Sequence, residues 1–275
     1  MYGKECNAMK KAYVHGYDLQ ENIRLQDQAN TLIDLLHSDT AYPSGSLVLE
    51  AGCGVGAQTL TLARNSPGAS IVSMDISAAS ILQAEEKIRA AGLTNVRFQQ
   101  GDLYHLPFAE ASFDHVFVCF VLEHLNDPVL ALQRLKACLR PGGTMTVIEG
   151  DHGSAFFYPD SNEAHGAISC QVELQSRAGG NARIGRSLYP LLVTAGFSEV
   201  LVSPRMVYAD SSRPDIVDGF TKRTFTVMIE GVRQSAIEEG IIDSATFDRG
   251  IQALYRTTEP DGTFCCTFFK AVVKG

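Results

Sequence analysis

A glycine-rich stretch at residues 50–56 has the residue types needed to hold a small charged ligand. Glycines at positions 52, 54 and 56 follow Glu50, and two aliphatic residues, Val48 and Leu49, precede it. Residues 57–64 carry apolar side chains at helical spacing, so the pattern predicts a strand, a tight turn and a helix. Glycine permits positive φ and lets a ligand approach bare backbone, while the helix N-terminus offers unpaired N–H groups. The turn therefore suits a nucleotide-like ligand.

Two cofactors fit the spacing of these glycines. Gly52-x-Gly54-x-x-Ala57 matches the dinucleotide fingerprint in its terminal-alanine form, in which a pyrophosphate lies at the helix N-terminus. Glu50-x-Gly52-x-Gly54-x-Gly56 also resembles the first motif of class I S-adenosylmethionine-dependent methyltransferases, in which the turn holds a zwitterionic methionine moiety. The turn alone leaves both alternatives open.

Two further carboxylates follow predicted strands. Asp75 ends the apolar run at residues 70–75, and Gly101 and Asp102 follow the alternating run at residues 96–100. In an open α/β sheet, ligands bind outside the carboxyl ends of the strands. Asp75 is thus placed to accept both ribose hydroxyls, and a helix cap for Ser77 onward is the alternative that the position makes less favoured. Asp102 is placed to accept from an adenine amine, which a dinucleotide site does not specially require, and this favours adenosylmethionine.

The elements that must position these residues form an alternating series. Residues 115–120 and 144–149 read as a fourth and a fifth strand, and helical patterns alternate with the five strands. Strands that alternate with helices predict a doubly wound α/β sheet. A sixth strand at residues 200–208 and an antiparallel seventh at residues 264–273 would complete a seven-stranded, mostly parallel sheet.

The order of several motifs is similar to that of class I methyltransferases, and most similar to the ubiquinone and menaquinone biosynthesis-like branch. The resemblance covers residues 47–150 and continues more weakly to the end of the chain. The motifs that carry it are Glu50 to Gly56, Asp75, Gly101-Asp102, Ser112-Phe113-Asp114, Leu122 to Leu125 and Leu139 to Gly143.

This resemblance implies a Rossmann-like fold and a set of cofactor-binding residues. Glu50, Gly52, Cys53, Gly54 and Gly56 would surround the methionine moiety. The remaining implied contacts are Asp75 and Ile76 at the ribose, Gly101, Asp102 and Leu103 at the adenine, and Phe120 and Val121 at the floor of the site.

Three domains or segments are expected around this site. Residues 47–210 and 261–275 would form the methyltransferase domain, and residues 211–260 a helical cap inserted on the substrate side, because fifty residues are far more than a hairpin connection needs. Residues 1–46 would form a helical lid, in which apolar residues at helical spacing predict one helix across residues 22–37. Tyr17, Arg24 and Gln28 are candidates to close the cofactor site. A solvated flank is the alternative for this segment.

The chemistry of methyl transfer requires no fixed catalytic motif. A methyl group on a sulfonium is already activated, so the protein must align the reacting atoms and exclude water. A base is needed only if the acceptor arrives protonated. His152 is the candidate base because an imidazole accepts protons at neutral pH, and Glu149 and Asp151 are its neighbours after strand five. A structural role is the alternative for His152, and it is favoured for Glu123 and His124.

Candidate substrate-binding residues lie in the later part of the chain. They are Tyr158, Arg183 and Phe220, and the aromatic residues around Phe156 and Phe220 favour an acceptor with apolar surface. Arg186 would equally bind substrate or cap the following helix.

Composition limits the classes of function. The chain has 275 residues and a net charge of -8, which argues against a protein that tracks a nucleic-acid backbone. Seven scattered cysteines without a C-x-x-C pair suggest neither a disulfide framework nor a zinc site. Neither a membrane-spanning run nor a signal peptide is evident, so we expect a cytoplasmic protein without membrane insertion. The oligomeric state is not predicted.

The sequence therefore predicts an enzyme that moves the methyl group of S-adenosylmethionine to O, N or C of a small-molecule acceptor, leaving S-adenosylhomocysteine. The alternatives are an NAD(P)-dependent oxidoreductase and a non-catalytic S-adenosylmethionine-binding protein. No metal is expected.

Overall fold

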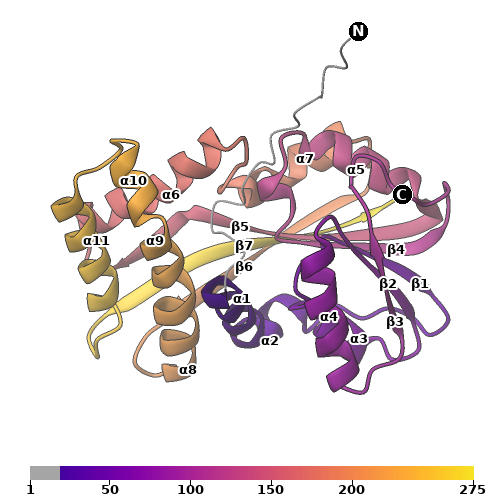
Figure 1. The fold of residues 1–275 in the computed structure, drawn as a ribbon, viewed down its shortest axis with the longest axis horizontal. Coiled ribbons are helices and arrows are strands. Elements are labelled where there is room, and N and C mark those ends of the chain that lie inside the picture. The colour runs from indigo at the N-terminus through magenta and orange to yellow at the C-terminus, as the bar shows by residue number, and fades with distance from the viewer. Residues whose placement is uncertain (1–18) are drawn as a thin grey trace, which may run out of the picture.

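The computed structural model describes residues 19–275, in which one mixed sheet runs through the molecule (Figure 1). Its strand order is β3-β2-β1-β4-β5-β7-β6. Strands β1 to β5 pair in parallel, whereas β7 is antiparallel to both β5 and β6. The strands are β1 (Leu47–Ala51), β2 (Ser70–Asp75), β3 (Val96–Gln100), β4 (Phe113–Cys119), β5 (Leu139–Tyr158), β6 (Val200–Ala209) and β7 (Thr263–Lys274). The seven-stranded, mostly parallel sheet predicted from the sequence is confirmed.

Helices cover both faces of the sheet. Those up to β5 are α1 (Leu19–Thr31), α2 (Ile33–His37), α3 (Thr59–Asn65), α4 (Ala78–Ala90), the short 3-10 helix η1 (Leu122–His124) and α5 (Pro128–Ala137). Those between β5 and β6 are α6 (Asn162–Arg177), η2 (Ile184–Ser187) and α7 (Leu188–Thr194). Those between β6 and β7 are α8 (Pro214–Ile216), the π-helical η3 (Val217–Thr226), α9 (Val227–Gly231), α10 (Arg233–Glu238) and α11 (Ser244–Arg256).

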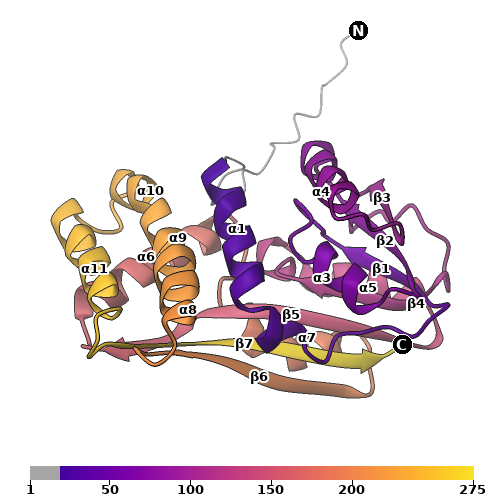
Figure 2. The same ribbon diagram turned by 90° about the horizontal axis from the view of Figure 1, so that it is seen from below.

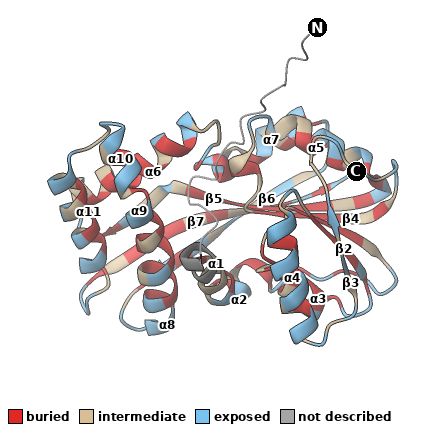
Figure 3. Ribbon diagram, viewed as in Figure 1, coloured by how far each residue is buried: buried red, intermediate tan, exposed pale blue. Residues whose placement is uncertain are grey.

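Two hydrophobic clusters form the core, one on each face of the sheet. Successive strand residues belong to different clusters, as Val48 and Leu49 of β1 show. Val48 packs in the cluster that includes residues of α2, α3, α6, η3 and α11, and Leu49 in the cluster that includes α5 and α7. Central parallel strands buried on both faces read as continuous apolar runs, which explains the composition of β4. Figure 3 shows the buried residues following these central strands.

The inserted helices gather at one end of the sheet. Figures 1 and 2 both place α6, α9, α10 and α11 beside the extended ends of β5 and β7, with α1 between this group and α4. Helix α11 packs against α6, and η3 packs against α1. Phe247, Ile251 and Leu254 face inward from α11, as their spacing predicts. Helices therefore do occupy residues 211–260, and their role as a substrate cap remains a prediction.

Two predicted boundaries were wrong. The helix expected across residues 22–37 is divided at Leu32, where φ is -99° and ψ is 6°, into α1 and α2. Strand β5 was expected at residues 144–149 but runs from Leu139 to Tyr158, because its second half pairs with the start of β7 from Phe156↔Cys265 to Tyr158↔Thr263. Glu149, Asp151 and His152 therefore lie within a strand and not after it.

Among the helices of residues 19–275, none combines the length and the apolar character needed to cross a lipid bilayer.

Candidate active site

The turn after β1 is built on glycines in left-handed conformations. Gly52 has a φ of +80°, and a Cβ there would lie 2.5 Å from Cγ2 of Val121. Gly54 has a φ of +51°, and a Cβ there would meet no atom within 4 Å. The amides of Gly52 and Cys53 both donate to the carbonyl of Met74, at 2.7 and 3.0 Å. The turn is thus fixed against β2 on one side and presents bare backbone at Gly54 on the other.

Asp75 at the end of β2 holds this turn. Its Oδ2 accepts from the amide of Gly54 at 2.8 Å, and its Oδ1 accepts from the amide of Ser77 at 2.8 Å. The N-cap of α4 is Ser77, whose hydroxyl accepts from the amide of Ser80. Each carboxylate oxygen has more than one acceptor site, so Asp75 retains capacity for ligand hydroxyls.

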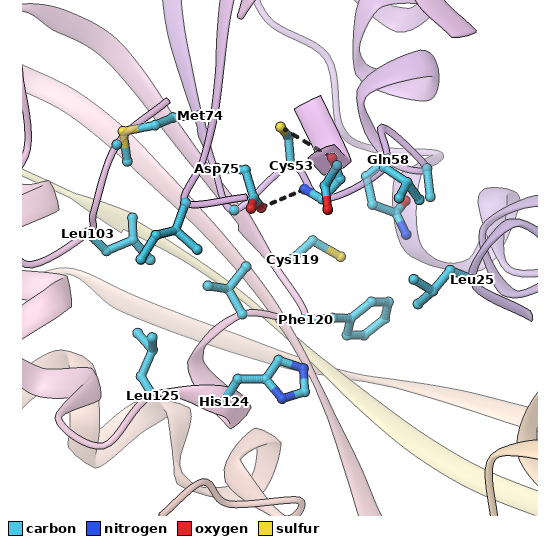
Figure 4. Close-up of a pocket in the computed structure, with 18 of the residues that line it drawn as sticks. Leu25, Cys53, Gln58, Met74, Asp75, Leu103, Cys119, Phe120, His124 and Leu125 are labelled. Atoms are coloured by element: carbon cyan, nitrogen blue, oxygen red, sulfur yellow. Dashed lines mark hydrogen bonds between the residues drawn. The ribbon is translucent and has the colours of Figure 1, made fainter. Parts of the chain in front are cut away.

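A cavity of about 500 Å³ opens above the turn. In Figure 4, Asp75 and Gln58 lie on one side of it, and Phe120 and His124 on the other. Its walls are Leu25, Gln28, Gly52, Cys53, Gly54, Val55, Ala57, Gln58, Met74, Asp75, Ile76, Ser80, Gly101, Asp102, Leu103, Tyr104, Cys119, Phe120, Val121, His124 and Leu125. The cavity thus collects the carboxyl ends of β1, β2 and β4, the residues after β3, and α1.

Asp102 follows β3, and its carboxylate forms hydrogen bonds with two nearby residues, Tyr104 and His105. Oδ1 accepts from the amide of Tyr104 at 2.9 Å, and Oδ2 lies 3.1 Å from Nδ1 of His105. Carboxylates at the ends of β2 and β3 therefore face one cavity, as the parallel arrangement of the strands predicts.

The comparisons with known proteins agree with this geometry. Residues 49–147 match the model of the family described as Methyltransferase domain. The chain is 34% identical over 158 residues to trans-aconitate 2-methyltransferase of Deinococcus radiodurans, which covers 56% of this chain and 55% of the relative. It is 29% identical over 134 residues to demethylmenaquinone methyltransferase of Staphylococcus carnosus, with 48% and 55% covered. The chain thus spans about half the length of the curated relatives that it matches.

Residues 49–147 are a class I methyltransferase domain. Its relatives place it in the ubiquinone and menaquinone-like branch, and S-adenosylmethionine is its cofactor. The fold is similar to that of a solved structure, phosphoethanolamine N-methyltransferase 2 from Haemonchus contortus with S-adenosylhomocysteine bound. The TM-score is 0.59 and the sequence identity 16%, and the match covers 94% of this chain and 58% of the other.

The cavity of the methyltransferase domain fits this cofactor. Because Gly54 has no Cβ, its main chain is open to the methionine moiety of the cofactor. The carboxylates of Asp75 and Asp102 can accept hydrogen bonds from the hydroxyl and amine groups of the cofactor. Most of the predicted cofactor-binding residues line the cavity: Gln28, Gly52, Cys53, Gly54, Asp75, Ile76, Gly101, Asp102, Leu103, Phe120 and Val121.

Other expected cofactor residues lie outside the cavity lining. Glu50 is buried beneath the turn, where its Oε2 accepts from the hydroxyls of Thr59 and Ser73 at 2.7 and 2.6 Å. Burial raises the pKa of Glu50 to about 7, and those two hydrogen bonds oppose the rise. Gly56 packs against Ala84, and Arg24 is buried with its Nη1 donating to Gln28 at 3.0 Å. Tyr17 lies outside the described residues.

Glu149 and Asp151, named as catalytic candidates, are buried among structural partners. Oε1 of Glu149 accepts from the amides of Val121 and Leu122 at 3.0 and 2.8 Å. Burial, followed by the nearby Glu123, raises the pKa of Glu149 well above its usual value. Asp151 forms a bidentate ion pair with Arg186, whose Nε and Nη2 donate to the two carboxylate oxygens at 2.6 and 2.8 Å. The side chain of Arg186 therefore does not cap α7, as had been one expectation for it.

His152 and Arg183 lie together in a second cavity of about 350 Å³. The other proposed substrate residues line neither cavity. Phe220 is buried in an aromatic cluster with Phe225, Phe264 and Phe268, and Tyr158 is exposed at the end of β5.

Several residues of the first cavity were not predicted from the sequence, among them Leu25, Gln58, Tyr104 and Leu125. His124, for which a structural role was favoured, also lines this cavity, and its Nε2 lies 3.4 Å from Oε1 of Glu123. The position of His124 directly after the fourth strand, at the ligand-binding edge of the sheet, was the available indication.

Proposed function

We propose that this protein transfers the methyl group of S-adenosylmethionine to an O, N or C atom of a small-molecule acceptor by in-line displacement. The supporting observation is the lining of the first cavity. It combines the open main chain of Gly54 and the carboxylates of Asp75 and Asp102 with the side chains of Phe120 and His124. When bound, the cofactor supplies a methyl group that is activated by its sulfonium. The chain's own residues bind, orient and exclude water.

Within this proposal, Asp75 accepts from the ribose hydroxyls and Asp102 from the adenine amine. Leu25 and Gln28 of α1 belong to the cavity wall, which supports a lid role for residues 1–46. The helices of residues 211–260 cap the substrate side, with η3 packed against α1.

His152 is the proposed base for an acceptor that arrives protonated. Its Nδ1 lies 3.1 Å from Oε1 of Gln171, which holds the ring in place. Glu149 and Asp151 act as positioning residues: Glu149 holds the main chain after β4 at Val121 and Leu122, and Asp151 holds Arg186.

Incubation with methyl-labelled S-adenosylmethionine and a metabolite extract tests the proposal, with labelled products identified by mass spectrometry. We expect a labelled small molecule that is absent from a boiled-protein control. Tight binding of S-adenosylhomocysteine without any labelled product would indicate a non-catalytic binding protein. Stabilisation by NAD(P) and not by S-adenosylhomocysteine, measured as a thermal shift, would indicate an oxidoreductase.

A further inference from the structure

The second cavity lies between the extended half of β5 and α6, which are neighbours in Figure 1. Its lining combines apolar side chains with polar and charged ones: His152, Gly153, Ala155, His165, Ile168, Ser169, Val172, Glu173 and Arg183. A volume of about 350 Å³ suits a small organic molecule and not a single ion.

Arg183 brings a guanidinium into this cavity that has no hydrogen-bond or ion-pair partner within residues 19–275. The other charged lining residues are paired: His165 lies 2.8 Å from Asp160, and Glu173 lies 2.9 Å from Arg177, which also pairs with Glu239. The stem of Arg183 crosses Gly153, where a Cβ would lie 2.7 Å from its Cδ. Glycine at 153 thus leaves the space that this arginine occupies.

A chain of buried side chains fixes the proton of His152. Gln175 donates from Nε2 to the carbonyl oxygen of Glu123 at 2.9 Å, and a carbonyl only accepts, so the amide orientation of Gln175 is determined. Its Oε1 then accepts from Nε2 of Gln171 at 2.6 Å, which turns Oε1 of Gln171 toward Nδ1 of His152. The neutral ring must therefore carry its proton on Nδ1, which leaves Nε2 as an acceptor.

The same chain ties the second cavity to the first. Gln171 and Gln175 are 0% and 1% exposed, so their hydrogen bonds do not compete with water. Glu123, the last residue of this hydrogen-bond series, belongs to η1 together with His124, which lines the first cavity. A series of buried hydrogen bonds thus runs from His152 in the second cavity to η1, which borders the first.

We propose that the second cavity binds the carboxylate group of the methyl acceptor, which makes the acceptor a small carboxylic acid. Arg183 pairs with the carboxylate, and Nε2 of His152 accepts a hydrogen bond from a hydroxyl or amine of the same molecule. Ile168 and Val172 contact its apolar part. This inference rests on the proposed function, since it names the substrate class of that reaction.

A titration with 4-hydroxybenzoate, monitored by ligand-observed NMR, tests the subsite. The first cavity is first saturated with S-adenosylhomocysteine, so that the probe reports on the second. The neutral probe 4-hydroxybenzamide has nearly the same shape without the charge. The variants are Arg183→Gln, Arg183→Lys, which keeps a cation, and Arg89→Gln, which removes one exposed charge from α4 as a control.

We expect 4-hydroxybenzoate to bind the wild-type protein and Arg89→Gln equally, at least about tenfold more weakly to Arg183→Gln, and with intermediate affinity to Arg183→Lys. The benzamide should bind the wild-type protein at least about tenfold more weakly than the acid. The proposal is overturned if the acid does not bind the wild-type protein, if Arg183→Gln binds it as the wild-type protein does, or if acid and amide bind alike. Binding of S-adenosylhomocysteine is measured separately as a thermal shift of the protein. If it does not bind, the proposed function is contradicted, and not the carboxylate subsite.

Discussion

The carboxylate of Asp75 accepts a hydrogen bond from the amide of Gly54 at 2.8 Å. This contact joins the end of β2 to the turn after β1, so one side chain both shapes the glycine turn and faces the cofactor cavity. Loss of Asp75 should therefore affect the ligand more than it affects the fold, because the turn is also held by the carbonyl of Met74.

We predict that Asp75→Ala weakens S-adenosylhomocysteine binding by at least about tenfold, because the ribose hydroxyls lose a charged acceptor. Isothermal titration calorimetry measures the change. Ser77→Ala is the matched control, since it removes the N-cap of α4 at a cost of about 1 kcal/mol in stability but no group of the cavity. An unchanged dissociation constant in Asp75→Ala would show that the ribose assignment is incorrect.

Gly54→Ala and Gly45→Ala should separate backbone strain from ligand contact. Both glycines have positive φ, +51° and +84°, and both have open space where a Cβ would stand. Each substitution should lower the free energy of unfolding by about 1–2 kcal/mol, measured by urea denaturation. Only Gly54→Ala should also weaken S-adenosylhomocysteine binding, because only Gly54 lines the cavity. Equal cofactor affinity in the two variants would contradict the assignment of Gly54.

The buried carboxyl of Glu50 should make stability depend on pH. Its pKa is raised from 4.5 to about 7 in the folded protein, so the native state binds the proton more tightly than the unfolded chain. This contribution is fully present below pH 4.5 and is lost as pH rises through 7. Relative to Glu50→Gln, the wild-type protein should lose about 3 kcal/mol of unfolding free energy over that range.

Urea denaturation from pH 4 to pH 8 measures the effect of Glu50. Glu85→Gln, an exposed change on α4, serves as the control and should follow the wild-type curve. Parallel pH profiles for Glu50→Gln and the wild-type protein would mean that Glu50 ionises in the folded state without penalty.

Gln171 should act on the reaction through His152. Gln171→Leu removes the acceptor of the Nδ1 proton and strands a buried amide, so we expect a loss of about 1–3 kcal/mol in stability and a slower methyl transfer. Gln171→Glu keeps an acceptor, and its carboxylate favours the protonated ring, so the acidic limb of the pH–rate profile should move to higher pH. The profile is measured on the acceptor found by labelling. A wild-type profile in Gln171→Glu would exclude a role for His152 in proton transfer.

The sequence by itself determined the parts of the cofactor site that follow from local pattern. Alternate glycines required a turn with positive φ, and the strand periods placed Asp75 and Asp102 at strand ends. Because parallel strands share one carboxyl edge, these residues were predictable as neighbours without any knowledge of packing.

Only the tertiary structure decided the length of β5 and the surroundings of its acidic residues. The second half of β5 pairs with β7 from Phe156↔Cys265 onward, a contact between residues far apart in the chain that no local period encodes. The chain from His152 through Gln171 and Gln175 to Glu123 likewise joins a strand, a helix and a turn. Local spacing fixes which face of an element a residue occupies, whereas its partners depend on how the elements pack.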